Sequence, residues 1–428
     1  MAPAFQPLPS QSRPSYLKRT ALSLLSGLLV LGVLELGYRA FLGVREARGQ
    51  KNPRFYVCSA PVYEFDPAEG YRYQPGVSAV QALIQDGRVV RHWPVQVNSD
   101  GLIGEFSGPW DSNTFNIAVF GDSFTANPID SITWTDYLPE GLSSPDGRPV
   151  AVRNYGRDGY GMLQIVGLAA TRAETLRPDL VLIAFLTTDL VRARTWRTVQ
   201  VVDGEERVFT TIEPIRAPVK ARVVDTVLID RRVTADWCRQ QEQEDRRDDP
   251  LLVELCSRYR RYRAEQLVVS FRDCRRLFIL NRLLYKDPYY GLHQPDHVNY
   301  ARCSEFRQDA EFVRDMDRLR SLQIPVCWVH LPILEEWAAR RHIFSKRHAV
   351  FATSLESFGV EPVSLLSALP SLPRDYASLF LLPYDRHVSR RGARRYGEAM
   401  RMLLIRKGLV TVQAARRADS EGPTKKAR

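Results

Sequence analysis

Two absences narrow the interpretation of this 428-residue chain. Its six cysteines include no C-x-x-C pair, so the cysteine spacing of a structural zinc site is missing. The formal net charge is +11, yet the sequence has neither a recognition helix nor zinc-finger spacing. Because the basic residues are scattered, we expect them on a solvated surface that faces anionic surroundings. No nucleic-acid partner, metal ion or cofactor is predicted.

The cysteines leave one question open. Four of the six lie between Cys238 and Cys303. Disulfides in an oxidising compartment are one option, and the sequence does not specify their pairing. Cys327 lies in the apolar run "IPVCWVHLP" and is therefore predicted to be a buried core thiol.

The sequence also has no long uncharged run. Thr20–Leu34 carries no charge but is shorter than the about 20 residues needed to cross a bilayer. The run is long enough if it continues to Leu42, with Glu35 and Arg39 paired at i, i+4 spacing. No convincing small-x-small cleavage site follows, so we predict an uncleaved transmembrane anchor over residues 16–44. Basic residues flank both ends, and the positive-inside rule alone does not orient it.

Composition divides the rest of the chain. Residues 1–15 and 409–428 are predicted to be disordered, and residues 45–104 to form a linker and a small β-rich segment. Strand and helix patterns alternate over 105–408, which predicts an α/β domain with a doubly wound parallel sheet. A long Arg- and Tyr-rich segment at about 190–308 breaks this alternation and is predicted to be an inserted helical cap.

Five apolar runs are predicted to be the strands of that sheet. They are "FNIAVFGD", "RPVAVRNYG", "RPDLVLIAFLTTD", "QIPVCWVHLP" and "VEPVSLL". Helical periodicity separates several of them, and a closing helix is predicted to begin near Ser389. Because parallel strands end at one edge of a sheet, residues that follow these runs are expected to meet there.

Polar residues follow each run at this edge. Asp122 and Ser123 follow the first run, in "FGDSFTAN". The others are Asn154, Gly156, Gly159 and Gly161 after the second run, Thr187, Thr188 and Asp189 after the third, His330 after the fourth, and Asp385 and His387 before the last helix. Together they offer a hydroxyl, an imidazole, a carboxylate and hydrogen-bond donors, which is what serine acyl chemistry requires.

These segments resemble, in order, the sequence blocks of the SGNH (GDSL) hydrolases over roughly residues 98–406. "FGDSFT" is similar to the GDS(L) block. "EFDPAEGYRYQPG" and "VNSDGLIG" are similar to what precedes it in membrane-anchored bacterial members. The resemblance implies a flavodoxin-like doubly wound sheet. It also implies a single-pass protein of the bacterial inner membrane, with its catalytic domain in the periplasm or outside the cell.

The resemblance also implies roles for individual residues. Ser123 would be the nucleophile, His387 the general base and Asp385 the carboxylate that orients His387. Gly159 and Thr188 would help to bind the oxyanion, beside the backbone N–H of Ser123. The supporting residues would be Asp122, Asn154 and Asp189. The implied substrate is an acyl ester, with O-acetyl groups of a cell-envelope glycan among the options.

Two departures from the family pattern keep alternatives open. Thr188 stands where the family usually has an asparagine, and its hydroxyl donates one hydrogen bond with a shorter reach. Asp385 and His387 form D-x-H rather than D-x-x-H, which is similar to a subset that includes alginate-type O-acetyltransferases. The candidates are therefore an esterase, an O-acyltransferase for envelope polysaccharide, and a catalytically impaired binding or assembly protein.

Structural explanations stand beside the catalytic ones. Ser123 suits a helix N-cap, and Asp385 and His387 suit the start of the last helix. The glycines suit ordinary turns, and His330 suits the core. "HQPDHV", residues 293–298, has a metal-like composition but no further ligand cluster nearby in the sequence.

Overall fold

The structure is a computed structural model of the chain, and it divides into two compact units. One comprises residues 1–53 and 256–287, and the other residues 54–255 and 288–428. The described residues are 20–21, 23–34, 36–37, 54–103, 111–127, 132–202, 204–214, 222–272, 306, 309–342, 345–382 and 386–412. The disorder predicted for residues 1–15, and the residues Asp385, His293, Asp296 and His297, lie outside them.

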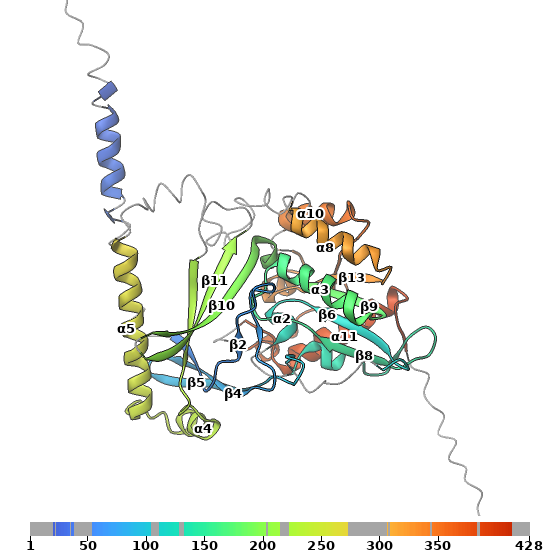
Figure 1. The fold of residues 1–428 in the computed structure, drawn as a ribbon, viewed down its shortest axis with the longest axis horizontal. Coiled ribbons are helices and arrows are strands. Elements are labelled where there is room, and N and C mark those ends of the chain that lie inside the picture. The colour runs from blue at the N-terminus through green and yellow to red at the C-terminus, as the bar shows by residue number, and fades with distance from the viewer. Residues whose placement is uncertain are drawn as a thin grey trace, which may run out of the picture. The chain divides into compact units, whose positions relative to one another are not determined.

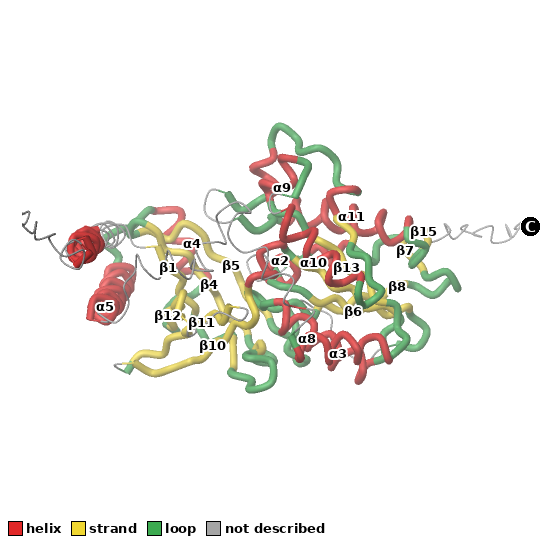
Figure 2. Tube along the Cα trace, turned by 90° about the horizontal axis from the view of Figure 1, so that it is seen from above, coloured by secondary structure: helices red, strands yellow, loops and turns green. Residues whose placement is uncertain are grey.

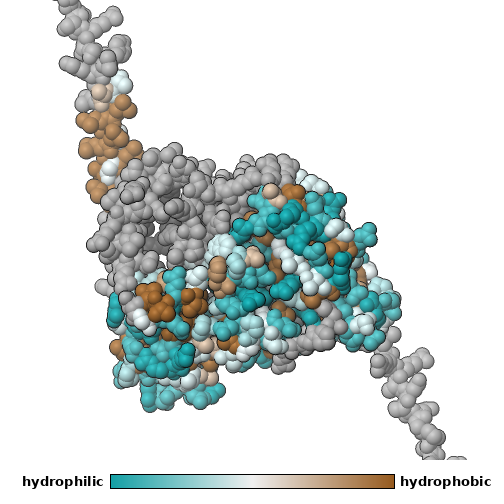
Figure 3. Space-filling view, viewed as in Figure 1, coloured by the Kyte–Doolittle hydropathy of each residue, from teal (hydrophilic) through white to brown (hydrophobic). Residues whose placement is uncertain are grey.

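Residues 20–21, 23–34 and 36–37 are helical and fall within the anchor predicted over residues 16–44. Their apolar side chains are exposed, among them Leu24 at 65% and Leu29 at 71%, and they are brown in Figure 3. Among the residues that the structure describes, no helix has both the length and the apolar character needed to cross a membrane. The predicted transmembrane helix is therefore not found in the described part of the chain.

A five-stranded parallel sheet lies at the centre of the larger unit. Its strands are β6 (Phe115–Phe120), β8 (Val150–Asn154), β9 (Leu180–Phe185), β13 (Val326–His330) and β14 (Val363–Ser364). They run in the order β14-β13-β9-β6-β8, and every neighbouring pair is parallel. Numbered along the chain, this order is 2-1-3-4-5, the arrangement of flavodoxin-like doubly wound sheets. The predicted α/β class with a parallel sheet is confirmed.

Helices cover both faces of this sheet, as Figures 1 and 2 show. Successive side chains of β9 alternate between two hydrophobic clusters, with Ile183 and Phe185 in one and Leu182 and Ala184 in the other. Helices of the first cluster are α3 (Met162–Leu176), α8 (Ala310–Ser321) and α10 (Ser345–Glu356), and those of the second are α9 (Leu334–Ala339) and α11 (Arg390–Arg406). Burial on both faces explains why the strands read as continuous apolar runs.

A second, six-stranded sheet joins segments that are distant in sequence. In spatial order its strands are β10 (Arg192–Val202), β11 (Glu205–Pro214), β12 (Arg222–Ile229), β1 (Arg54–Cys58), β4 (Ser78–Gln85) and β5 (Arg88–Gln96). β1 pairs in parallel with β12, and the other pairs are antiparallel. The β-rich segment predicted over residues 45–104 thus supplies one half of this sheet.

The insertion predicted to be helical at about 190–308 supplies the other half. This part of the prediction is wrong for residues 192–202, 205–214 and 222–229, which form β10, β11 and β12. The run "RTWRTVQVV" is rich in β-branched residues and contains a tryptophan, and these residue types favour a pleated, half-buried strand over a helix. Helices follow only afterwards, as α4 (Ala235–Glu244) and α5 (Pro250–Arg272).

The remaining elements are short. They are β2 (Tyr63–Glu64), β3 (Arg72–Tyr73), β7 (Leu142–Ser143), β15 (Thr411–Val412), helix α2 (Ser123–Ala126), and 3₁₀ turns at Trp134–Tyr137, Thr187–Val191, Leu365–Ser367 and Tyr376–Leu379. The cysteines among the described residues are buried free thiols: Cys58, Cys238, Cys256 and Cys327. Cys327 is 5% exposed in β13, as predicted, and burial raises the pKa of its thiol to about 11.

Candidate active site at the carboxyl edge of the parallel sheet

Ser123 lies where the first strand of the parallel sheet ends. β6 stops at Phe120, and a Cβ on Gly121 would lie 2.6 Å from the carbonyl oxygen of Ala184, so only glycine fits this turn. Asp122 is the N-cap of α2 and accepts a hydrogen bond from Phe124 N at 2.9 Å. Ser123 is therefore the first residue of the helix and not its cap, and its hydroxyl donates to Asp122 Oδ2 at 3.4 Å.

The position of Ser123 in the sheet matters for ligand binding. β6 has β8 on one side and β9 on the other, so the chain reverses its direction of winding between β6 and β9. In open α/β sheets, ligands bind outside the carboxyl ends of the strands at this switch point. The hydroxyl of Ser123 is mostly enclosed there, with the residue 8% exposed.

His387 reaches the same edge from the opposite end of the chain. Its ring centroid lies 4.9 Å from that of Phe124, the residue next to Ser123. Burial raises the pKa of Asp122, and the charges of Arg192 and His387 oppose this rise, which places the imidazole within electrostatic range of Asp122. The start of α11 is capped by Ser389, whose hydroxyl accepts from the backbone N–H of Gly392 at 3.3 Å. His387 is thus not the cap of the last helix.

Arg192 connects the acidic residues of this edge. Its guanidinium lies 3.4 Å from Asp122 Oδ2, forms an ion pair with Asp189 and donates to the carbonyl of Gly159 at 3.3 Å. Asp189 also accepts from Leu186 N at 2.8 Å. Burial, and then the charge of Asp122, raise the pKa of Asp189 well above its usual range, while Arg192 opposes them. Arg192 is not among the site residues predicted from the sequence, where its i, i+3 spacing from Asp189 is the only signal that could have indicated it.

Asn154 holds the turn after β8 against α2. Its Nδ2 donates to Thr125 O at 2.7 Å, and its Oδ1 accepts from Gly156 N at 2.9 Å. A Cβ on Gly156 would lie 2.7 Å from Ala126 N, so the two backbones meet too closely for any side chain. Asn154 is therefore a positioning residue for the helix that carries Ser123.

Asp158 and a group of aromatic residues hold the next turn. The Asp158 carboxylate accepts from Arg197 at 2.7 Å and from the hydroxyl of Tyr63 at 3.1 Å. Its backbone N–H donates to Tyr73 at 3.0 Å, and its carbonyl accepts from Tyr71. The tyrosines come from the β-rich approach segment, which thereby contacts the predicted site directly.

These hydrogen bonds orient the peptide group between Asp158 and Gly159, whose N–H is one of the oxyanion donors predicted from the sequence. The carbonyl of Asp158 and the N–H of Gly159 belong to the same planar trans peptide and point in opposite directions. Because Tyr71 binds that carbonyl, the N–H of Gly159 is directed away from Tyr71. Gly159 has φ +81°, a conformation that favours glycine.

The two threonines that follow β9 differ in their burial and in their partners. Thr188 is half-buried at the start of the turn after β9. Thr187 is buried, and its hydroxyl lies 3.1 Å from Nε2 of His330. His330 is fully buried, in agreement with its interpretation as a core histidine. Its Nδ1 lies 3.1 Å from the hydroxyl of Ser364. His330 therefore belongs to a separate cluster beside the candidate site.

Comparisons with known proteins add little to this geometry. No family model matches the sequence, and no curated protein matches it. Among solved structures, the chain is similar to the lipase/acylhydrolase from Enterococcus faecalis, at 13% sequence identity and a TM-score of 0.31. The likeness covers 70% of this chain and 99% of that one. At this level a likeness carries no argument about activity, which depends on the residues of the chain itself.

Proposed function

We propose that this protein is a serine ester hydrolase of the SGNH type, acting on acyl esters through an acyl-enzyme. The observation that carries the proposal is the position of Ser123. Its hydroxyl lies at the switch point of the 2-1-3-4-5 sheet, and the ring of His387 packs on the adjacent Phe124. A hydroxyl and an imidazole on neighbouring segments are the two groups that nucleophilic acyl transfer needs first.

In the proposed reaction, Ser123 Oγ attacks the ester carbonyl while His387 accepts its proton. The tetrahedral intermediate collapses, the alcohol leaves with the proton from His387, and the acyl group stays on Ser123 as an ester. His387 then removes a proton from a water molecule that attacks this ester, and returns the proton to Ser123 Oγ as the acid is released. Asp385, two residues before His387 in the sequence, is assigned to orient the imidazole.

The negative charge on the carbonyl oxygen needs donors that are already in place. We assign this role to the backbone N–H groups of Ser123 and Gly159, with the Thr188 hydroxyl as a third donor. The hydrogen bond from Tyr71 to the Asp158 carbonyl supports the assignment of Gly159, because it holds the shared peptide in one orientation.

A fluorophosphonate probe tests the proposal directly. The probe reacts with an activated serine, so we expect one modified peptide that contains Ser123, and strongly reduced labelling in His387→Ala. Ser354 provides an internal control, since it is also buried, at 1% exposure against 8% for Ser123, and among the described residues its hydroxyl bonds only to Val350 O in α10. An intact, folded chain in which Ser123 stays unmodified would contradict the proposed nucleophile.

Thr188 favours a second candidate, a chain with this fold whose catalysis is impaired. A threonine hydroxyl reaches less far than the amide of an asparagine, and one good oxyanion donor is worth about a hundredfold in rate. If the wild type is a working esterase, we expect Thr188→Asn to raise kcat by about tenfold and Thr188→Val to lower it. A wild type without measurable turnover, rescued by Thr188→Asn, would instead identify the impaired form.

Two finer features remain predictions from the sequence. The D-x-H spacing of Asp385 and His387 keeps an O-acyltransferase open, and transfer to a glycan hydroxyl faster than hydrolysis would replace the esterase assignment. The periplasmic or extracellular location behind an N-terminal anchor is untested by the described residues. Membrane fractionation of the full chain, compared with a chain lacking residues 1–44, would test it.

A further inference from the structure

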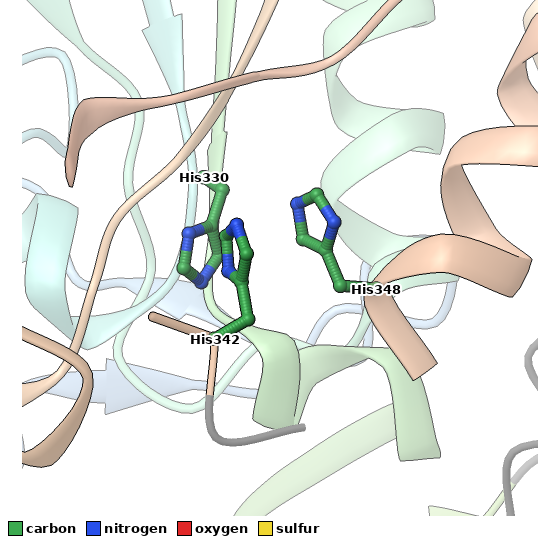
Figure 4. A group of neighbouring side chains, drawn as sticks. All are labelled: His330, His342 and His348. Atoms are coloured by element: carbon green, nitrogen blue, oxygen red, sulfur yellow. The ribbon is translucent and has the colours of Figure 1, made fainter. Parts of the chain in front are cut away.

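Three histidines meet beside the candidate site, as Figure 4 shows. His330 ends β13, His342 follows α9, and His348 lies in the first turns of α10. One ring nitrogen of each lies within 4.8 Å of the corresponding atoms of the other two. The ring centroids of His342 and His348 are 3.9 Å apart, and those of His330 and His342 are 4.5 Å apart. The sequence analysis did not group them, since they come from three separate elements.

A carboxylate lies within this group. Glu336 is 1% exposed, with Oε2 3.3 Å from Nε2 of His330 and Oε1 3.9 Å from Nδ1 of His342. The Glu336 carboxylate is therefore held against two of the imidazoles, away from water.

Packing alone does not account for the two outer rings. Nδ1 of His342 and Nε2 of His348 are buried, and neither has a hydrogen-bond partner among the described residues. His342 and His348 are half-buried as residues, but these two nitrogens are out of reach of solvent. A buried polar atom without a partner costs about 1–3 kcal/mol, so two at one place are unfavourable. A neutral imidazole has one unprotonated ring nitrogen, whose lone pair can bind a metal ion.

We propose that His330, His342 and His348 bind a transition-metal ion of the zinc class, with the Glu336 carboxylate balancing its charge. Neutral imidazoles are preferred ligands of Zn²⁺, and three histidines form a recurrent protein site for it. A tetrahedral ion with Zn–N bonds of about 2.0–2.1 Å needs nitrogens about 3.4 Å apart. The observed separations of at most 4.8 Å require the ring nitrogens to approach by up to about 1.4 Å, which is within the range of side-chain rotation.

The hydrogen-bond partners of His330 suit a histidine that binds a metal ion. The Ser364 hydroxyl, 3.1 Å from Nδ1 of His330, can accept that N–H and leave Nε2 as the ligand atom. Thr187 lies 3.1 Å from the same Nε2 and 3.4 Å from Glu336 Oε1. The ion would join the end of β13 to the segments before and within α10. The inference is independent of the role of Ser123.

Zinc titration of the full chain, purified without a histidine tag and treated with a chelator, tests the site. Isothermal titration is expected to show one tightly bound Zn²⁺ per chain. His342→Gln and His348→Gln are each expected to weaken binding by at least tenfold. The matched control is His92→Gln, since His92 also contacts a carboxylate, Glu242 at 2.8 Å, but lies outside the cluster.

The double variant His293→Gln/His297→Gln separates this site from the metal-like "HQPDHV" segment. Unchanged zinc affinity in that variant and in His92→Gln is expected. X-ray absorption at the zinc edge of the wild type needs no variant to fold, and three imidazole ligands are expected. No tight binding, binding that survives both cluster substitutions, loss of binding only in the His293/His297 variant, or a sulfur-coordinated ion would overturn the proposal.

Discussion

Replacing Ser123 with alanine is expected to lower kcat for a short-chain acyl ester by about 10⁴-fold or more. The substitution removes the only oxygen that the proposed mechanism acylates, while the backbone N–H groups that bind the oxyanion remain. Such donors alone still accelerate hydrolysis over the reaction in water, so a small residual rate is expected. Release of a chromogenic alcohol, followed at saturating substrate, measures the effect on kcat directly.

The control for this substitution is Ser354→Ala. Ser354 is 1% exposed and its hydroxyl bonds only to Val350 O within α10, so the change removes an oxygen of similar burial without touching the sheet edge. Its rate should equal that of the wild type. Equal turnover by the wild type and Ser123→Ala would contradict the nucleophile, provided that circular dichroism shows both chains to be folded.

The parallel sheet is predictable from sequence because its strands are apolar on both faces. All six residues of β9 are buried, and the runs that contain β6 and β13 show the same continuous pattern. Such runs, bounded by turn residues and separated by helical periodicity, leave few alternatives to a doubly wound sheet. The start of α11 is also specified by local sequence. Ser389 is its N-cap, and the helix begins where the sequence predicts it.

The second sheet is not predictable in the same way. β1 pairs in parallel with β12, so Tyr56 lies opposite Val227, and nothing local in either segment specifies this partner. Arginines also interrupt the alternation of β10, which hides its period-two pattern. The sequence of this segment therefore predicts helices, whereas the structure pairs β10 with β11 continuously over Thr195–Val202.

The same distinction applies to the candidate site. Ser123, Asp122 and Asp189 follow strands directly, so a correct sheet places them at one edge. The partners that hold them do not follow from strand order. Arg192 is the first residue of β10, and the tyrosines around Asp158 lie in β2, in β3 and in the segment between them. Their contacts with Asp122 and Asp158 depend on tertiary packing, which no local sequence pattern specifies.

Asp158→Asn is expected to lower the free energy of unfolding by about 2–4 kcal/mol. The side chain of Arg197 is 10% exposed, and the substitution leaves its guanidinium without the carboxylate that it contacts at 2.7 Å. Its contacts over the rings of Tyr63 and Tyr71, 4.2 Å and 4.9 Å from the centroids, do not replace that charge. The expected loss lies at the lower end for buried pairs, because the Asp158 side chain is 25% exposed. Urea unfolding measures it.

The matched control is Asp317→Asn, which breaks an ion pair with Arg320 whose side chains are 57–60% exposed. Exposed pairs contribute little, so its unfolding midpoint should not move appreciably. Burial raises the pKa of Asp158, but the charge and hydrogen bond of Arg197, the charge of His387 and the hydrogen bond from Tyr63 together lower it below its usual value. Its contribution is therefore present above the usual aspartate pKa of about 3.9 and is lost as the pH falls through the lowered value. The difference between wild type and Asp158→Asn should be constant from about pH 5 to 8 and shrink below about pH 4. A difference that is absent at neutral pH, or that grows in acid, would show that the ion pair does not hold this turn.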